Sequence, residues 1–137
     1  MTYLHLTFMH LATILPAFVI GTVLMLRRKG SPSHKLWGKV FLLLMLTTAV
    51  ITLFMPAAVG ARWLGHFGVI HIFCIVVFIS VPRAYSAARR GNIRAHRANM
   101  IGLYVGAILI AGAFTFAPGR MLHNAVVNGK LETPSPR

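Results

Sequence analysis

Long apolar runs separated by short basic joints dominate the chain. A helix needs about 20 mostly apolar residues to cross a bilayer, and four runs reach that length. Their approximate bounds are Tyr3–Leu26, Val40–Ala61, Trp63–Val81 and Asn99–Ala117. No Asp, Glu, Lys or Arg interrupts any of them. The pattern predicts an all-α integral membrane protein, with a four-span domain over residues 1–120 and a polar C-terminal tail over residues 121–137.

Composition strengthens the membrane interpretation. Of the 137 residues, 57% are hydrophobic and only 11% are charged, whereas soluble domains carry about 25% charged residues. The net charge of +13 is of the kind that nucleic-acid-binding proteins show. Here, however, the cations are confined to the joints between apolar runs. We therefore expect a lipid bilayer as partner and no nucleic acid.

The distribution of cations between the joints predicts the orientation. The first joint carries Arg27, Arg28, Lys29, Lys35 and Lys39. The third joint carries Arg83, Arg89, Arg90, Arg94 and Arg97. Against these ten cations, the second joint and the tail together hold only four, which are Arg62, Arg120, Lys130 and Arg137. Because cytoplasmic loops are enriched in Lys and Arg, the first and third joints are predicted to be cytoplasmic and both termini to lie outside.

The same joints are expected to contact lipid. Cations near a membrane surface are attracted to anionic lipid by about 1 kcal/mol each. The residues expected to make anion or lipid contacts are Arg28, Lys29, Lys35, Arg89, Arg90 and Arg97.

An internal repeat becomes visible when the sequence is shifted by 61 residues. The shift superposes His5 on His66, His10 on His71, Arg28 on Arg89, Lys29 on Arg90 and Gly30 on Gly91. Repeats in membrane folds are often faint in sequence, so matches of rare residue types are informative. The pattern predicts a four-helix bundle built from two parallel helical hairpins, over about residues 3–59 and 63–118. A chance alignment of two basic loops is the competing explanation.

Small and polar residues recur at helical spacing and predict the faces that pack together. One stripe in the first run comprises His10, Thr13, Ala17 and Gly21. A second comprises His34, Gly38, Phe41, Met45, Thr48 and Thr52, if that helix begins as early as His34. The fourth run contains Gly102-x3-Gly106, a spacing typical of close helix approach.

Four histidines are candidate ligands. His10 and His71 fall inside apolar runs near the outer side, where ionisable residues are functional candidates. His34 and His96 fall at the basic side. Side chains on facing helices build the cofactor sites of helical bundles, so both pairs are candidate axial ligands of haem b. The alternative for His10 and His71 is a hydrogen bond to a threonine or a backbone carbonyl of a neighbouring helix.

The outer pair, His10 and His71, is the better candidate for haem iron. Lys39 and Arg97 place the inner pair at the membrane edge, which is shallow for a buried haem. The arrangement is similar to that of two-haem transmembrane cytochromes b of the b-561 type, in which alternate helices ligate alternate haems.

Two classes of function follow, with a third behind them. The first is an electron-transfer protein, with haem as cofactor and a quinone or another redox protein as partner. The second is an accessory or binding protein whose His34, His96 and nearby arginines form a cytoplasmic site for an anion, a lipid head group or a quinone. Transport of a small solute or a metal is the third. Catalysis by paired carboxylates or by a Ser-His-Asp triad is excluded within the chain, because its one acidic residue is Glu132 in the tail.

The order of short motifs resembles a family of bacterial predicted membrane proteins, domain of unknown function 2306. The residues that carry the resemblance are His10, the segment His34–Lys39 (HKLWGK), Phe67–Gly68, the segment His96–Met100 (HRANM) and Arg120. Lys35 and Lys39 stand where the family usually has arginine, and Asn99 where it often has tryptophan. The resemblance implies a small protein of the bacterial inner membrane with functional histidines at His10, His34 and His96. It implies no particular activity.

Overall fold

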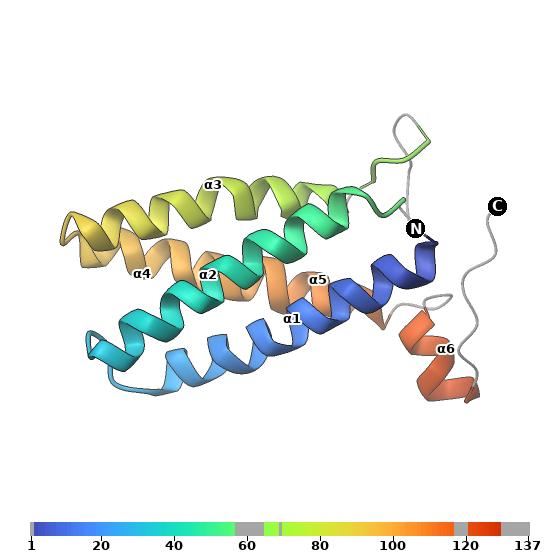
Figure 1. The fold of residues 1–137 in the computed structure, drawn as a ribbon, viewed down its shortest axis with the longest axis horizontal. Helices are drawn as coiled ribbons and strands as arrows, with labels where there is room; N and C mark the ends of the chain where they lie inside the picture. The colour runs from blue at the N-terminus through green and yellow to red at the C-terminus, as the bar shows by residue number, and fades with distance from the viewer. Residues whose placement is uncertain (1, 57–64, 69, 117–120, 130–137) are drawn as a thin grey trace.

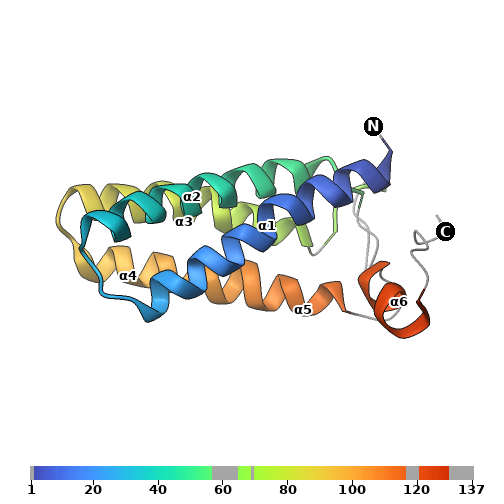
Figure 2. The ribbon, with the colours of Figure 1, turned by 60° about the horizontal axis from the view of Figure 1, so that its bottom comes forward.

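The computed structural model describes residues 2–56, 65–68, 70–116 and 121–129, and this part of the chain is helical with no β-strand. The elements are α1 (Tyr3–Leu26), α2 (Pro32–Leu53), α3 (Ile70–Arg89), α4 (Ile93–Gly102), the π-helix η1 (Leu103–Ile110), α5 (Ala111–Thr115) and α6 (Met121–Asn128). The segments α4, η1 and α5 follow one another directly and form one rod (Figure 1). This rod lies alongside α1, α2 and α3, and α6 lies across one end (Figures 1 and 2).

The membrane character of the chain is visible in its helices. By length and hydropathy, α1, α2 and α3 are each able to cross a bilayer. Many large apolar side chains on these helices are exposed, among them Leu15, Val19, Leu43 and Ile75. Such an outer surface suits lipid, because lipid tails solvate apolar side chains that water would not.

The observed helix α2 begins eight residues earlier than the predicted span at Val40. Its start is fixed by Ser31, whose hydroxyl accepts a hydrogen bond from the backbone N–H of His34 at 3.1 Å, and by Pro32 in the first turn. Serine caps and first-turn prolines both favour helix initiation. The condition that the second stripe needed, a helix that includes His34, is therefore met.

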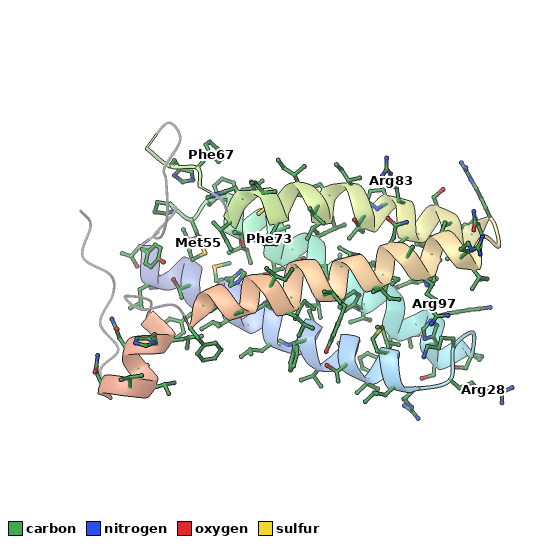
Figure 3. The ribbon with its side chains drawn as sticks, turned by 180° about the vertical axis from the view of Figure 1, so that it is seen from behind. Arg28, Met55, Phe67, Phe73, Arg83 and Arg97 are labelled. Carbon is green, nitrogen blue, oxygen red and sulfur yellow. The ribbon has the colours of Figure 1, made fainter. Side chains whose placement is uncertain are left out.

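Helix α3 also departs from the predicted span Trp63–Val81, because it begins at Ile70 and continues to Arg89. Residues 57–64 lie outside the described part of the chain, and residues 65–68 form a turn. Arg83, predicted to lie in a loop, is in α3 with an exposed side chain that points away from the neighbouring helices (Figure 3). A long cationic side chain near a helix end can reach the membrane surface while its backbone stays helical.

The two basic turns have the same local structure. Gly30 and Gly91, which are 61 residues apart, adopt positive φ angles of +85° and +73°, a region that glycine enters without steric cost. The next residue is a helix cap in both turns: Ser31 accepts from the N–H of His34, and Asn92 accepts from the N–H of Ala95 at 3.1 Å. Both turns lie at the same end of the molecule (Figures 1 and 2).

The core runs along the inner faces of the helices. Ala17, Gly21 and Leu24 form the buried face of α1, as the first stripe predicted for Ala17 and Gly21. The remaining buried core residues are Phe41, Leu42, Met45, Ala49, Cys74, Val77, Val81, Ala84, Leu103, Ala107 and Ile108. Cys74 is a free, buried cysteine that packs in this core.

Gly21 is a position of close approach between α1 and its neighbours. A methyl group built there would lie 2.8 Å from Phe41 Cε2 and 2.9 Å from Tyr104 Cδ2. Tyr104 belongs to η1, and its hydroxyl is 2.7 Å from that of Thr22 on α1. Because the Thr22 hydroxyl donates to the Phe18 carbonyl, its oxygen accepts from Tyr104. The glycine thus allows a hydrogen bond that joins α1 to the rod formed by α4, η1 and α5.

The predicted close approach at Gly102 and Gly106 is wrong. A methyl group built at either position would meet nothing within 4 Å. The glycine that lies at a close helix contact is Gly21 on α1 instead.

We predict that Gly21→Ala destabilises the protein by about 1–3 kcal/mol, because the added methyl overpacks the site between Phe41 and Tyr104. Gly102→Ala is the matched control and is expected to be neutral or slightly stabilising, since alanine favours helix and the site has room. Thermal unfolding in detergent, followed by circular dichroism, measures both. Equal midpoints for the two variants would contradict the close approach at Gly21.

Candidate functional site

His10 joins the middle of α1 to the last turns of α2. Its Nδ1 lies 2.9 Å from the Thr48 hydroxyl oxygen and 3.0 Å from that of Thr52. Thr48 and Thr52 are one helical turn apart and so present both oxygens on the same face of α2. Thr48 is one of the few buried polar residues, with 4% of its surface exposed, and the ring satisfies its hydroxyl. A hydrogen bond from His10 to a threonine of a neighbouring helix was the predicted alternative to a role as metal ligand, and the structure contains this hydrogen bond.

The direction of these bonds defines the tautomer of His10. The Thr52 hydroxyl donates its hydrogen to the Thr48 carbonyl at 2.8 Å. Its oxygen can then only accept from the ring, so Nδ1 of His10 carries the proton. In the neutral ring, Nε2 then carries the lone pair.

A cavity of about 530 Å³ lies beside this histidine. His10, Thr48 and Thr52 are part of its lining, which is otherwise mostly apolar and draws on α1, α2, α3, η1, α5 and α6. Its aromatic residues are Tyr3, Phe18, Phe73 and Phe116. Small-molecule sites are typically of this size, apolar, and supplied with a few polar groups that orient the ligand.

His66 and His71 have a different task, which is to bond backbone carbonyls at the end of α2 and just after it. His66 Nε2 donates to the Leu53 carbonyl at 2.9 Å, and His71 Nε2 donates to the Met55 carbonyl at 3.1 Å. Phe67 packs edge-on against both rings, with centroid distances of 5.0 and 5.1 Å. The last carbonyls of a helix have no partner within it, so His66 supplies the partner that the Leu53 carbonyl lacks. His71 instead bonds the Met55 carbonyl in the segment that follows α2. Met55, Phe67 and Phe73 lie at the end opposite Arg28 and Arg97 (Figure 3).

The geometry of His71 does not suit an axial haem ligand. The ring is buried, Nε2 donates to Met55, and Nδ1 accepts from the backbone N–H of Gly68 at 3.1 Å. An imidazole needs an unused lone pair to bind iron, and here the lone pair on Nδ1 is occupied. His71 is also absent from the lining of the cavity beside His10. The residues present therefore do not fit a haem held between His10 and His71.

The inner histidines are closer to their predicted arrangement. His34 lies in the first turn of α2, within electrostatic range of His96 and Lys29. His96 lies in the first turns of α4, and its Nδ1 donates to the Ala84 carbonyl of α3 at 2.9 Å. His34 Nδ1 is buried and has no hydrogen-bond partner among the described residues. Both histidines thus lie at the basic end, and Nδ1 of His34 has no hydrogen-bond partner in the described part of the chain.

The predicted lipid-contacting cations divide between two roles. Lys29 donates to the Met25 carbonyl at 2.7 Å and caps α1, and Arg89 contacts the Tyr85 hydroxyl at 3.5 Å. Lys35, Arg90 and Arg97 are exposed, and Arg28 lines a second pocket at the first basic turn.

Sequence reasoning missed several functional groups. Thr48 and Thr52 had been assigned to packing, although their spacing from His34 already placed them on the inward face of α2. Met55 and Gly68 contribute backbone atoms, which leave no signal in the sequence. Arg27 had been counted only for orientation, yet it shares the second pocket with Arg28.

Comparison with known proteins gives a family. A family model described as "Predicted membrane protein (DUF2306)" matches residues 2–130. No curated protein and no solved structure matches the chain.

We predict that His71→Leu destabilises the protein by about 1–3 kcal/mol for each polar group left unpaired, namely the Met55 carbonyl and the Gly68 N–H. His5→Leu is the control, since His5 is exposed and bonds only locally to Thr2. Thermal unfolding in detergent measures the difference. If both variants unfold at the same temperature, the hydrogen bonds of His71 to Met55 and Gly68 do not stabilise the fold.

Proposed function

Since the chain belongs to the DUF2306 family of predicted membrane proteins, we propose that it is a binding protein of the bacterial inner membrane whose ligand occupies the cavity beside His10. The ligand class is a neutral, ring-bearing apolar molecule, such as an isoprenoid quinone. The observation that carries the proposal is one imidazole, oriented by two threonines, on the wall of an otherwise mostly apolar cavity of about 530 Å³.

The proposal includes a four-span bundle made of two parallel hairpins, with both termini outside. Support comes from the rod α4–η1–α5, which packs beside three helices that are each able to cross a bilayer. Further support comes from the two basic turns, which share a positive-φ glycine, a capping residue and one end of the molecule. Cation-rich turns at one end are typical of cytoplasmic loops.

The lining of the cavity favours a neutral ligand. Among the residues that the structure describes, no Lys, Arg, Asp or Glu lines it. A carboxylate or a phosphate placed there would lose its hydration without gaining a counter-ion, which costs several kcal/mol. A fatty acid or a phospholipid head group is therefore a poor occupant of this site.

The same lining favours a planar ring. Phe18, Phe73 and Phe116 are part of the wall, together with the flexible side chains of Met45 and Met55. Aromatic side chains pack well in offset or edge-on arrangements against another ring. Methionine adapts its shape to an irregular ligand.

His10 offers the kind of hydrogen-bond acceptor that suits a hydroxyl of a quinol, the reduced form of a quinone. With the proton of His10 on Nδ1, the lone pair on Nε2 accepts from a ring hydroxyl of the reduced ligand. The threonines fix the ring plane, which orients that lone pair. The polar groups therefore set where a ring oxygen sits, while the apolar wall provides most of the contact.

We predict that a short-chain quinone in its reduced form, such as decylubiquinol, binds saturably to the purified protein, and that His10→Leu weakens this binding about fivefold or more. The factor corresponds to loss of one hydrogen bond of about 1 kcal/mol. Thr48→Val is expected to weaken binding in the same direction, because it removes one of the two groups that orient the ring. Equilibrium partition of the radiolabelled quinol between protein-containing and empty micelles measures the affinity.

His5→Leu is the matched control, because it removes an exposed histidine from the same helix that does not line the cavity. Binding by His5→Leu should equal that of the parent protein. Quinol that partitions equally into both kinds of micelle would overturn the proposal. An affinity unchanged in His10→Leu would remove His10 from the site.

A further inference from the structure

A second pocket lies at the basic end, between the last turns of α1 and the first turns of α2. Its volume is about 390 Å³. The wall on the α1 side is formed by Val19, Ile20, Val23 and Leu24, and the remaining lining is Arg27, Arg28, Ser31, Ser33, His34 and Trp37. The pocket therefore has an apolar length along the hairpin and a cationic end at the turn.

The cationic end is suited to an anion. Arg27 and Arg28 are both exposed at the turn, and no acidic residue of the described part of the chain lines the pocket. Guanidinium groups bind phosphate oxygens in a forked geometry that a single ammonium cannot match. The start of α2 adds the positive end of its helix dipole close by, at Ser31 and Ser33.

His34 gives an independent indication of a ligand. It lines this pocket, and its Nδ1 is buried without a hydrogen-bond partner among the residues that the structure describes. Buried polar atoms in proteins are nearly always paired, so an unpaired one calls for an explanation. A polar group bound at the turn would provide the partner.

The apolar side indicates what kind of anion is bound. Trp37 is 48% exposed, and aromatic rings of this kind collect at the level of lipid head groups. The side chains of Val19, Val23 and Leu24 continue the pocket away from the turn, along the direction that an acyl chain takes in a bilayer. A soluble anion would leave this apolar wall unused.

We propose that the pocket between α1 and α2 binds an anionic glycerophospholipid, with its phosphate at Arg27 and Arg28 and an acyl chain against Val23 and Trp37. The site is separate from the cavity beside His10 and does not depend on the ligand of that cavity. The second basic turn, which repeats the charge and the cap, contributes no residue to this pocket.

The test uses Trp37 as a reporter of lipid contact. Trp63→Phe leaves Trp37 as the one tryptophan of the chain. The protein is reconstituted into bilayers that contain either brominated phosphatidylglycerol or brominated phosphatidylcholine, since bromine quenches tryptophan fluorescence on contact. The result expected is stronger quenching by phosphatidylglycerol at equal mole fraction. An attraction of about 1 kcal/mol per cation corresponds to about fivefold enrichment for each guanidinium.

The control variant separates a site from general surface charge. Arg27→Gln/Arg28→Gln should abolish the preference for phosphatidylglycerol. Arg89→Gln/Arg90→Gln removes the same charge from the second turn and should keep the preference. Equal quenching by the two lipids, or an equal loss in the two double variants, would overturn the proposal. Displacement of phosphatidylglycerol by inorganic phosphate, at constant ionic strength, would overturn it in favour of a soluble anion.

Discussion

Each of the two ring nitrogens of a buried imidazole needs a hydrogen-bond partner. In this protein, the partners of the His10 and His71 rings determine how the helices around them are joined. His10 bonds through Nδ1 to two threonine hydroxyls beside a mostly apolar cavity. His71 uses both nitrogens on backbone atoms, namely the Met55 carbonyl just after α2 and the Gly68 N–H just before α3. The ring of His10 is oriented by threonine side chains, whereas the ring of His71 joins two backbone segments. Histidines that look equivalent in sequence thus have different kinds of partner.

The proposed internal repeat follows the same division. At the basic end the two halves are alike, because a positive-φ glycine and a capping side chain start a helix in each. At the other end they diverge, since His5 and His10 lie within α1, while His66 bonds the last carbonyl of α2 and His71 bonds the Met55 carbonyl after it. The pocket at Arg27 and Arg28 is likewise built by the first hairpin. The two hairpins of the proposed repeat therefore differ in the residues that they expose at their surfaces.

Sequence predicted the helical class, the apolar helices and the inward face of Ala17 and Gly21, because all three depend on local hydrophobic pattern. Helix ends were displaced, since caps such as Ser31 and arginines such as Arg83 extend helices beyond the apolar run. The roles of His10 and His71 could not be separated in advance. Their partners include backbone carbonyls and hydroxyls from other helices, which only tertiary packing brings near. The glycine motif failed for the same reason, because spacing does not reveal which face meets a neighbour.

The most direct test of this account is the protonation site of the two rings, read from ¹⁵N chemical shifts and N–H couplings of selectively labelled histidine in the detergent-solubilised protein. Assignment by His10→Leu and His71→Leu spectra identifies each signal. The account predicts opposite neutral tautomers, with the proton on Nδ1 of His10 and on Nε2 of His71. A proton on Nε2 of His10, or the same tautomer in both rings, would contradict it.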